Sequence, residues 1–216
     1  MTMLLLVCTL LSFCFVYPAL AQSTLVKAEA SANQPHVGDT LTVTIKISNV
    51  QNLYGVDVTL KWNTAVLNLV SATSKLGVES NPEGVLHESS IYPIEILDNT
   101  ATQSSGEYHL LATSTGSGTP SFSGSGTIAT VTLNVTNPGS VGLELQDVQI
   151  SIRASGESNV DLVSPQTSVD STNAVIPEFP TVTILIIALV AVAALLVSTK
   201  VLASRVGAPF KKAVRI

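Results

Sequence analysis

Thr40 to Val70 reads TLTVTIKISNVQNLYGVDVTLKWNTAVLNLV, and the spacing of its apolar residues decides the fold. Apolar side chains fall at every second position over 41–47 and again over 56–62, so each run can bury one face while the other meets water. Between the two runs, residues 48–55 are mostly polar and end in a glycine, which predicts a connection. After Trp62, residues 63–70 send apolar side chains back toward the core.

The rest of the segment from Gln22 to Ile176 repeats this pattern, and it contains no amphipathic helix of useful length. Gly, Pro, Asn and Ser clusters separate short alternating runs, which is typical of strands joined by turns. The sequence therefore predicts an all-β sandwich. The predicted strands are Val26–Ala30, Leu41–Ile47, Val56–Trp62, Ile91–Leu97, Tyr108–Thr113, Ile128–Val135, Val141–Ile152 and Val169–Ile176.

Three short motifs resemble the start of a cohesin domain. They are Val37–Thr40 before the run 41–47, Asn52–Val58 before Trp62, and Val66-Leu67 after Trp62. In addition, Gly126–Leu133 is similar to a late cohesin strand. The resemblance implies a jelly-roll β-sandwich of the cohesin type. It also implies the receptor half of the cohesin–dockerin pair, whose partner is a calcium-loaded dockerin in polysaccharide-degrading complexes. No Asp-x-Asp-x-Asp-Gly calcium loop occurs, so the chain does not resemble the dockerin half.

The resemblance also points to a partner-binding strand. Cohesins carry an exposed Asn-x-Asp there; Asp57 matches the Asp and Gly55 stands in the Asn place. Asp57 has the same parity as Thr59 and Lys61, so these four residues form the predicted partner-binding set. A solvated strand aspartate is the alternative interpretation of Asp57. Residues 112–118 lack the acidic contact that related cohesins have before their glycines, which implies a divergent or weaker dockerin.

Two other functions fit a sandwich of this kind. A carbohydrate-binding module would bind a polysaccharide, but such modules usually present a row of exposed aromatic side chains, and here aromatic residues are few and Trp62 alternates with core residues. A passive surface-layer protein needs only the fold and an anchor. The sequence favours a protein partner over a sugar.

The N-terminus predicts export. Leu4 to Leu20 is an apolar run that ends in Ala19-Leu20-Ala21, the small-x-small pattern of signal peptidase sites. Residues 1–21 are therefore interpreted as a signal peptide, with a permanent first membrane helix as the alternative, and the mature ectodomain spans 22–176.

The C-terminus predicts a membrane anchor. Thr181 to Thr199 holds 19 residues without a charge, enough at about 1.5 Å per residue to cross a bilayer as one transmembrane helix. The tail 200–216 carries five basic residues and no acidic one, which places it in the cytoplasm. Before the helix, Pro177–Pro180 reads PEFP and resembles the C-terminal sorting signal of archaeal surface proteins, in which the helix is a temporary anchor. The alternative is a stiff exit from the sandwich.

Charge and cysteine content exclude several classes. The chain has a net charge of −5, yet residues 22–176 hold 14 acidic against 5 basic residues, or −9. An acidic ectodomain argues against a nucleic-acid partner. Both cysteines, Cys8 and Cys14, lie in the predicted signal peptide, so disulfides and thiolate chemistry are not expected in the mature protein.

No pattern predicts catalysis, a metal or a cofactor, so the chain is not expected to be an enzyme. His36, His87 and His109 are scattered and are interpreted as surface or loop residues. Glu95 and Asp98 are interpreted as solvated charges, with a paired acid and base as the alternative.

Two further segments carry predictions. Asn134-Val135-Thr136 is the only glycosylation sequon, and the parity of Asn134 puts it on the solvent side; an unmodified asparagine is the alternative. The low-complexity run 116–126 is interpreted as a strand connection that Phe122 pins to the core.

Overall fold

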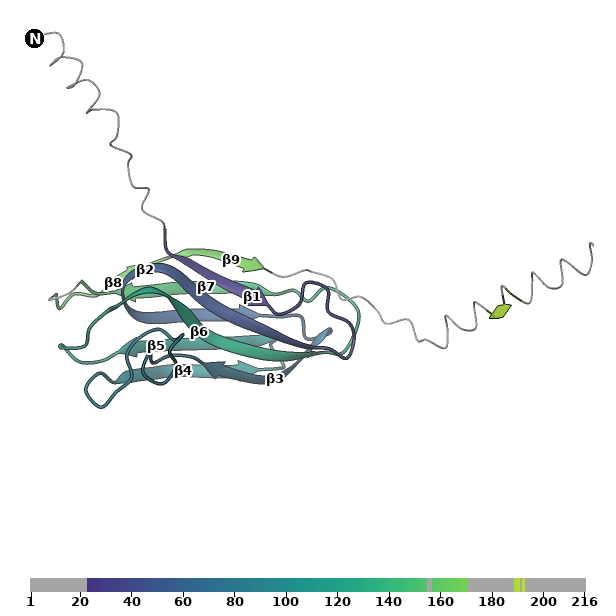
Figure 1. Ribbon diagram of the computed structural model, residues 1–216, viewed down its shortest axis with the longest axis horizontal. Coiled ribbons are helices and arrows are strands. Elements are labelled where there is room, and N and C mark those ends of the chain that lie inside the picture. Colours follow the sequence, from purple (N-terminus) through teal and green to yellow (C-terminus); the bar gives the residue numbers. More distant parts are fainter. Residues whose placement is uncertain (1–22, 155–156, 171–188, 191, 193–216) are drawn as a thin grey trace, which may run out of the picture. The chain divides into compact units, whose positions relative to one another are not determined.

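The computed structural model describes residues 23–154, 157–170, 189–190 and 192. The chain divides into two units, residues 1–176 and 177–216. The first unit holds all the strands of the described residues, and Figure 1 shows them in layers. They are β1 (Leu25–Ala30), β2 (Thr40–Lys61), β3 (Leu67–Ser74), β4 (Ile94–Thr102), β5 (Glu107–Ser114), β6 (Phe122–Val135), β7 (Glu144–Ile152), β8 (Asp161–Val163) and β9 (Gln166–Asp170). The all-β prediction is confirmed for the described residues between 23 and 170.

The long strand β2 belongs to both layers. Its first half pairs antiparallel with β1 and β6, and the order on that side is β3-β6-β2-β1-β9, with β1 and β9 parallel. Its second half, from Gly55 to Lys61, pairs with β5 on one side and β7 on the other, and β4 and β8 extend these pairs. One strand therefore joins the two layers.

The core lies between these layers, and alternation along the strands fills it. Leu41, Val43, Ile45 and Ile47 of β2 are at most 1% exposed, as the period of two predicts. The second half of β2 contributes Val56, Val58 and Leu60, and β5 and β6 contribute their own alternate residues to the same cluster. Trp62 is 4% exposed and belongs to this core.

The predicted connection at 48–55 is wrong, because β2 runs through it without ending. Asn49 and Asn52 both have a φ of 56°, and the register with β6 shifts around Val50 and again before Leu53. Asparagine tolerates this left-handed conformation, so the polar residues make bulges that bend the strand. Val50 and Leu53 stay fully buried and keep the strand attached to the core.

Other boundaries also differ from the prediction. β3 was not predicted as a strand, and it pairs with β6 along its length. β4 begins at Ile94 and not at Ile91, and β7 begins at Glu144 and not at Val141. In the described part of the chain the last strand is β9, which begins at Gln166 and overlaps the start of the predicted Val169–Ile176, while residues 171–176 lie outside the described residues. Phe122 does pack on the core, as predicted, but it begins β6, so the connection before it is shorter.

The predicted signal peptide, the PEFP juncture, the tail and nearly all of the predicted membrane helix lie outside the described residues. Residues 189, 190 and 192, which fall within the predicted span, are helical. Within the described part of the chain, no helix is both long and apolar enough to cross a membrane.

Candidate partner-binding face

The second half of β2 lies at the middle of a four-strand surface. Residues paired directly across strands point to the same side of a sheet, so the register defines which side chains share this surface. Asp57 pairs with Leu111 on one side and with Gln149 on the other, and Leu111 pairs in turn with Asp98. We call this surface the β2 face: Gly55, Asp57, Thr59 and Lys61 of β2, Glu107, His109, Leu111 and Thr113 of β5, Glu95, Asp98, Thr100 and Thr102 of β4, and Glu144, Gln146, Gln149 and Ser151 of β7.

His109 bridges two carboxylates across three strands of the β2 face. Its Nε2 lies 2.9 Å from Oδ1 of Asp57, and its Nδ1 lies 2.9 Å from Oδ2 of Asp98. The hydroxyl of Thr100 donates to the other oxygen of Asp98. All three members of the bridge are about one third exposed, so a docking partner can reach them.

The bridge shifts the pKa of His109 and the pKa of Asp98. Burial disfavours the charged ring of His109, but the hydrogen bonds to Asp57 and Asp98 outweigh it and raise its pKa above the ordinary value. The pKa of Asp98 is lowered, first by the hydroxyl of Thr100 and then by the hydrogen bond to His109. The geometry therefore favours a charged imidazole on His109 beside a charged carboxylate on Asp98.

The four predicted partner-binding residues are not equally accessible. Asp57 and Lys61 are half-buried, and Lys61 pairs with Glu107 at 3.4 Å. Thr59 is only 6% exposed, and Gly55 is buried. A Cβ at position 55 would collide with the hydroxyl of Ser151 and lie 3.0 Å from the carbonyl oxygen of Ala112. Glycine at 55 is therefore a packing requirement of the β2 and β7 pair.

The histidines were interpreted as surface or loop residues, but each has a carboxylate beside it, and His109 lies on strand β5 and not in a loop. His36 lies 3.6 Å from Asp39, His87 lies 3.2 Å from Glu79, and His109 has two partners. Asp98 is likewise a member of the bridge and not simply a solvated charge. Sequence spacing could not reveal this, since Asp57 and His109 are 52 positions apart. Only the pairing of β2 with β5 would have predicted it.

Apolar side chains accompany the bridge. Leu111 is half-buried at the centre of the β2 face, and Leu162 of β8 is 74% exposed beside it. Together with Gly55 and Asp57 they line a shallow hollow of about 100 Å³. The surface thus combines an acceptor group with an apolar contact.

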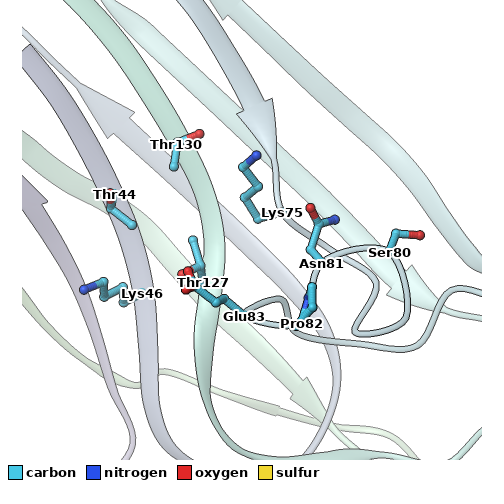
Figure 2. Close-up of a pocket in the computed structure, with 9 residues that line it drawn as sticks. All are labelled: Thr44, Lys46, Lys75, Ser80, Asn81, Pro82, Glu83, Thr127 and Thr130. Atoms are coloured by element: carbon cyan, nitrogen blue, oxygen red, sulfur yellow. The ribbon is translucent and has the colours of Figure 1, made fainter.

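A larger hollow, with a volume of about 490 Å³, shares no residue with the β2 face (Figure 2). Thr44 and Lys46 of β2 and Thr127 and Thr130 of β6 form its floor, and the segment 80–83 and Lys75 border it. Lys46 also pairs with Glu29 at 2.7 Å.

The tyrosines and the tryptophan do not form a sugar-stacking platform in the described residues. Trp62, Tyr54 and Tyr108 are 4%, 8% and 0% exposed, and Tyr92 is half-buried and packs beside His87. Among the same residues, no group of three or more His, Cys, Asp or Glu side chains could hold a metal ion. The β2 face is therefore the best-developed candidate site.

Comparison with known proteins identifies the fold. The sequence matches the Cohesin domain family over residues 26–175, more than two thirds of the chain. No curated protein matches it.

Similar solved structures include a non-cellulosomal cohesin from the hyperthermophilic archaeon Archaeoglobus fulgidus, with 17% identity, a TM-score of 0.48, and coverage of 72% of this chain and 92% of that one. A type II cohesin domain from the cellulosome of Acetivibrio cellulolyticus has 16% identity, a TM-score of 0.45, and coverage of 71% and 95%. The seventh ScaB type I cohesin of Pseudobacteroides cellulosolvens has 16% identity, a TM-score of 0.46, and coverage of 72% and 95%. Cohesin domains are non-catalytic protein-interaction modules, so the expectation that this chain is not an enzyme agrees with its family. On the family match over residues 26–175, the chain belongs to the cohesin domain family.

Proposed function

We propose that this cohesin domain binds a dockerin-bearing extracellular protein through the β2 face. The observation that carries the proposal is the position of Asp57 at the centre of that face. Of the two carboxylate oxygens of Asp57, Oδ1 contacts His109, and Oδ2 has no hydrogen-bond partner among the described residues. Oδ2 can therefore accept a bond from a docked protein. A charge-assisted hydrogen bond of this kind is about twice as strong as a neutral one.

The partner must complement both parts of the surface. It needs a side-chain or backbone donor for Asp57 and an aliphatic side chain for Leu111 and Leu162. In this proposal calcium belongs to the dockerin, which needs it to fold its loops. The cargo carried by the dockerin is a polysaccharide-degrading protein.

We propose further that the domain is displayed outside the cell on a single-pass anchor. The support is the apolar run Leu4 to Leu20 with its small-x-small end, the uncharged run Thr181 to Thr199 and the basic tail. The PEFP juncture leaves two outcomes, a retained helix and one removed by a sorting enzyme.

Binding to immobilised chain tests the function. The full chain is exposed to a panel of recombinant dockerins, each measured with calcium and with chelator. At least one dockerin should bind when calcium is present and not when chelator is present. Asp57→Ala should weaken the affinity of that dockerin by about tenfold or more. Glu83→Ala is the matched control, because Glu83 is an exposed carboxylate at the larger hollow, which shares no residue with the β2 face. Equal affinity of wild type and Asp57→Ala would exclude this use of the face.

A carbohydrate is the second candidate ligand, and the larger hollow at Thr44, Lys46 and Lys75 is the observation that favours it. Its hydroxyl and ammonium groups can bond sugar hydroxyls or a sugar carboxylate. A polysaccharide panel run beside the dockerins separates the two functions. Sugar binding should fall in Lys75→Ala and stay unchanged in Asp57→Ala. A chain that binds neither class supports a passive surface-layer role.

A further inference from the structure

The bridge at His109 can be complete in only one protonation state of the ring. A charged imidazole has two N–H donors, so it can donate from Nε2 to Asp57 and from Nδ1 to Asp98 at once. A neutral ring has one donor. In either neutral tautomer, one of the two carboxylates faces a nitrogen lone pair at 2.9 Å and loses its hydrogen bond.

Loss of the proton also changes the charge of the cluster. Two carboxylates and a charged ring carry one net negative charge, and the same carboxylates with a neutral ring carry two. A partner that docks on the β2 face removes water from this cluster. Removing water from a doubly charged cluster with one broken hydrogen bond costs more than removing it from the intact bridge.

No other charged group that faces His109 in the described residues can compensate for the loss of the ring's proton. Glu107, the nearest charged residue on β5 itself, already pairs with Lys61 of β2. From β7, Gln146 and Gln149 lie opposite Thr59 and Asp57 and are neutral, while Glu144 lies further along, opposite Lys61. From β4, Glu95 pairs in register with Thr113, beyond Leu111. Asp57 and Asp98 are therefore the groups whose position depends on the ring.

Building on the proposed function, we propose that His109 is a positioning residue of the β2 face whose protonated ring holds Asp57 ready for docking, and whose deprotonation weakens docking. Deprotonation of His109 therefore makes the affinity of the domain for its dockerin fall as the pH rises. It acts through Asp57, which makes the contact, and His109 need not touch the partner.

Titration of the histidine ring signals in the full chain tests the bridge without any partner. The sequence holds three histidines, so the spectrum is simple, and His109→Gln assigns the signal. His109 should titrate above the ordinary value for a histidine, because its ring donates to two carboxylates. Asp57→Asn and Asp98→Asn should each lower its midpoint by about half a pH unit or more, because each removes one acceptor. A His109 midpoint that neither variant lowers would overturn the bridge.

Docking at two pH values tests the regulation. With the dockerin that binds in calcium, affinity should be about tenfold weaker at a pH above the measured midpoint of His109 than below it. The dockerin has its own titrating groups, but these are common to wild type and His109→Gln, so the ratio between the two proteins isolates the ring. The His109→Gln variant should lose this pH dependence. The same pH profile in both proteins overturns this inference alone, whereas a panel in which nothing docks at either pH overturns the proposed function as well.

Discussion

Arg153 lies over the ring of Tyr54, with its guanidinium carbon 3.9 Å from the ring centroid. Arg153 is 8% exposed, and it donates to the carbonyl oxygens of Gly116 and Thr119. The hydroxyl of Tyr54 also donates to Gly116, at 3.1 Å. The two side chains therefore hold the Gly-Ser segment before β6 against β2 and the end of β7.

Loss of the contacts that Arg153 and Tyr54 make with this segment, here called the clamp, should destabilise the domain. Arg153→Ala removes the side-chain donor of the Thr119 carbonyl, one of the donors of the Gly116 carbonyl, and the cation–π contact, so the free energy of unfolding should fall by about 3 kcal/mol. Tyr54→Phe keeps the ring and loses one hydrogen bond, which should cost about 1 kcal/mol. Urea denaturation of the two variants measures both changes. Equal stability of Arg153→Ala and wild type would show that the clamp contributes nothing.

Gly55 should not tolerate a side chain. In Gly55→Ala the new methyl group collides with the hydroxyl of Ser151 and approaches the backbone of Ala112, which should cost about 1 to 3 kcal/mol. Adding Ser151→Ala removes the hydroxyl and should restore part of the loss, since the carbonyl oxygen of Ala112 stays in place. Thermal unfolding of the single and double variants checks this. Additive losses, with no recovery in the double variant, would contradict the packing explanation.

Acid should weaken the domain partly through Glu29. The hydrogen bond from Lys46, and then that from Lys27, holds the pKa of Glu29 below its ordinary value. A carboxyl with a lowered pKa in the folded state contributes stability above its unfolded pKa and loses it as the pH falls through the folded one. Unfolding free energies measured from about pH 5 downward should fall less steeply in Glu29→Gln than in wild type. Parallel curves would show that Glu29 has no part in the acid limb.

The sequence was sufficient for most of the strands because alternation reports burial directly. It failed at 48–55, where polar residues usually mark a turn and here form bulges inside one continuous strand, with Val50 and Leu53 as the buried residues that keep it in the sheet. Local composition cannot distinguish these two outcomes, because tertiary packing decides between them.

The candidate site was predicted only in part, for a related reason. Asp57 could be placed on an outward face by parity along its own strand. The contribution of His109 depends on which strand lies beside β2 and in what register, and no spacing within the chain encodes that pairing. Gly55 shows an error in the other direction. The resemblance placed Gly55 among the partner-contact residues, whereas the packing of Ser151 against it explains why this position is a glycine.

Asn134 is predicted to carry a glycan in a host that modifies exported sequons. It is exposed on β6, and its side-chain oxygen accepts a hydrogen bond from Thr40 at 3.2 Å, which leaves the amide nitrogen as the group to be modified. Intact-mass analysis of protein from the native host should show an added mass that Asn134→Gln abolishes. An unmodified mass in the wild type would remove the prediction.

The proposed display of the domain outside the cell predicts a specific proteolysis pattern on intact cells. The basic tail after Thr199 favours a cytoplasmic C-terminus, so added protease should release peptides of the domain, including those that contain Trp62, and spare an epitope tag placed after Ile216.

The same experiment distinguishes the two interpretations of the PEFP juncture. A retained helix keeps the tag on the same molecule as the domain, whereas removal by a sorting enzyme leaves mature protein without the tag and heavier than its polypeptide by a lipid. Permeabilised cells are the control, in which both the domain and the tag should be digested. Protection of the Trp62 peptides in intact cells, with digestion after permeabilisation, would reverse the topology and leave an extracellular dockerin without access to Asp57.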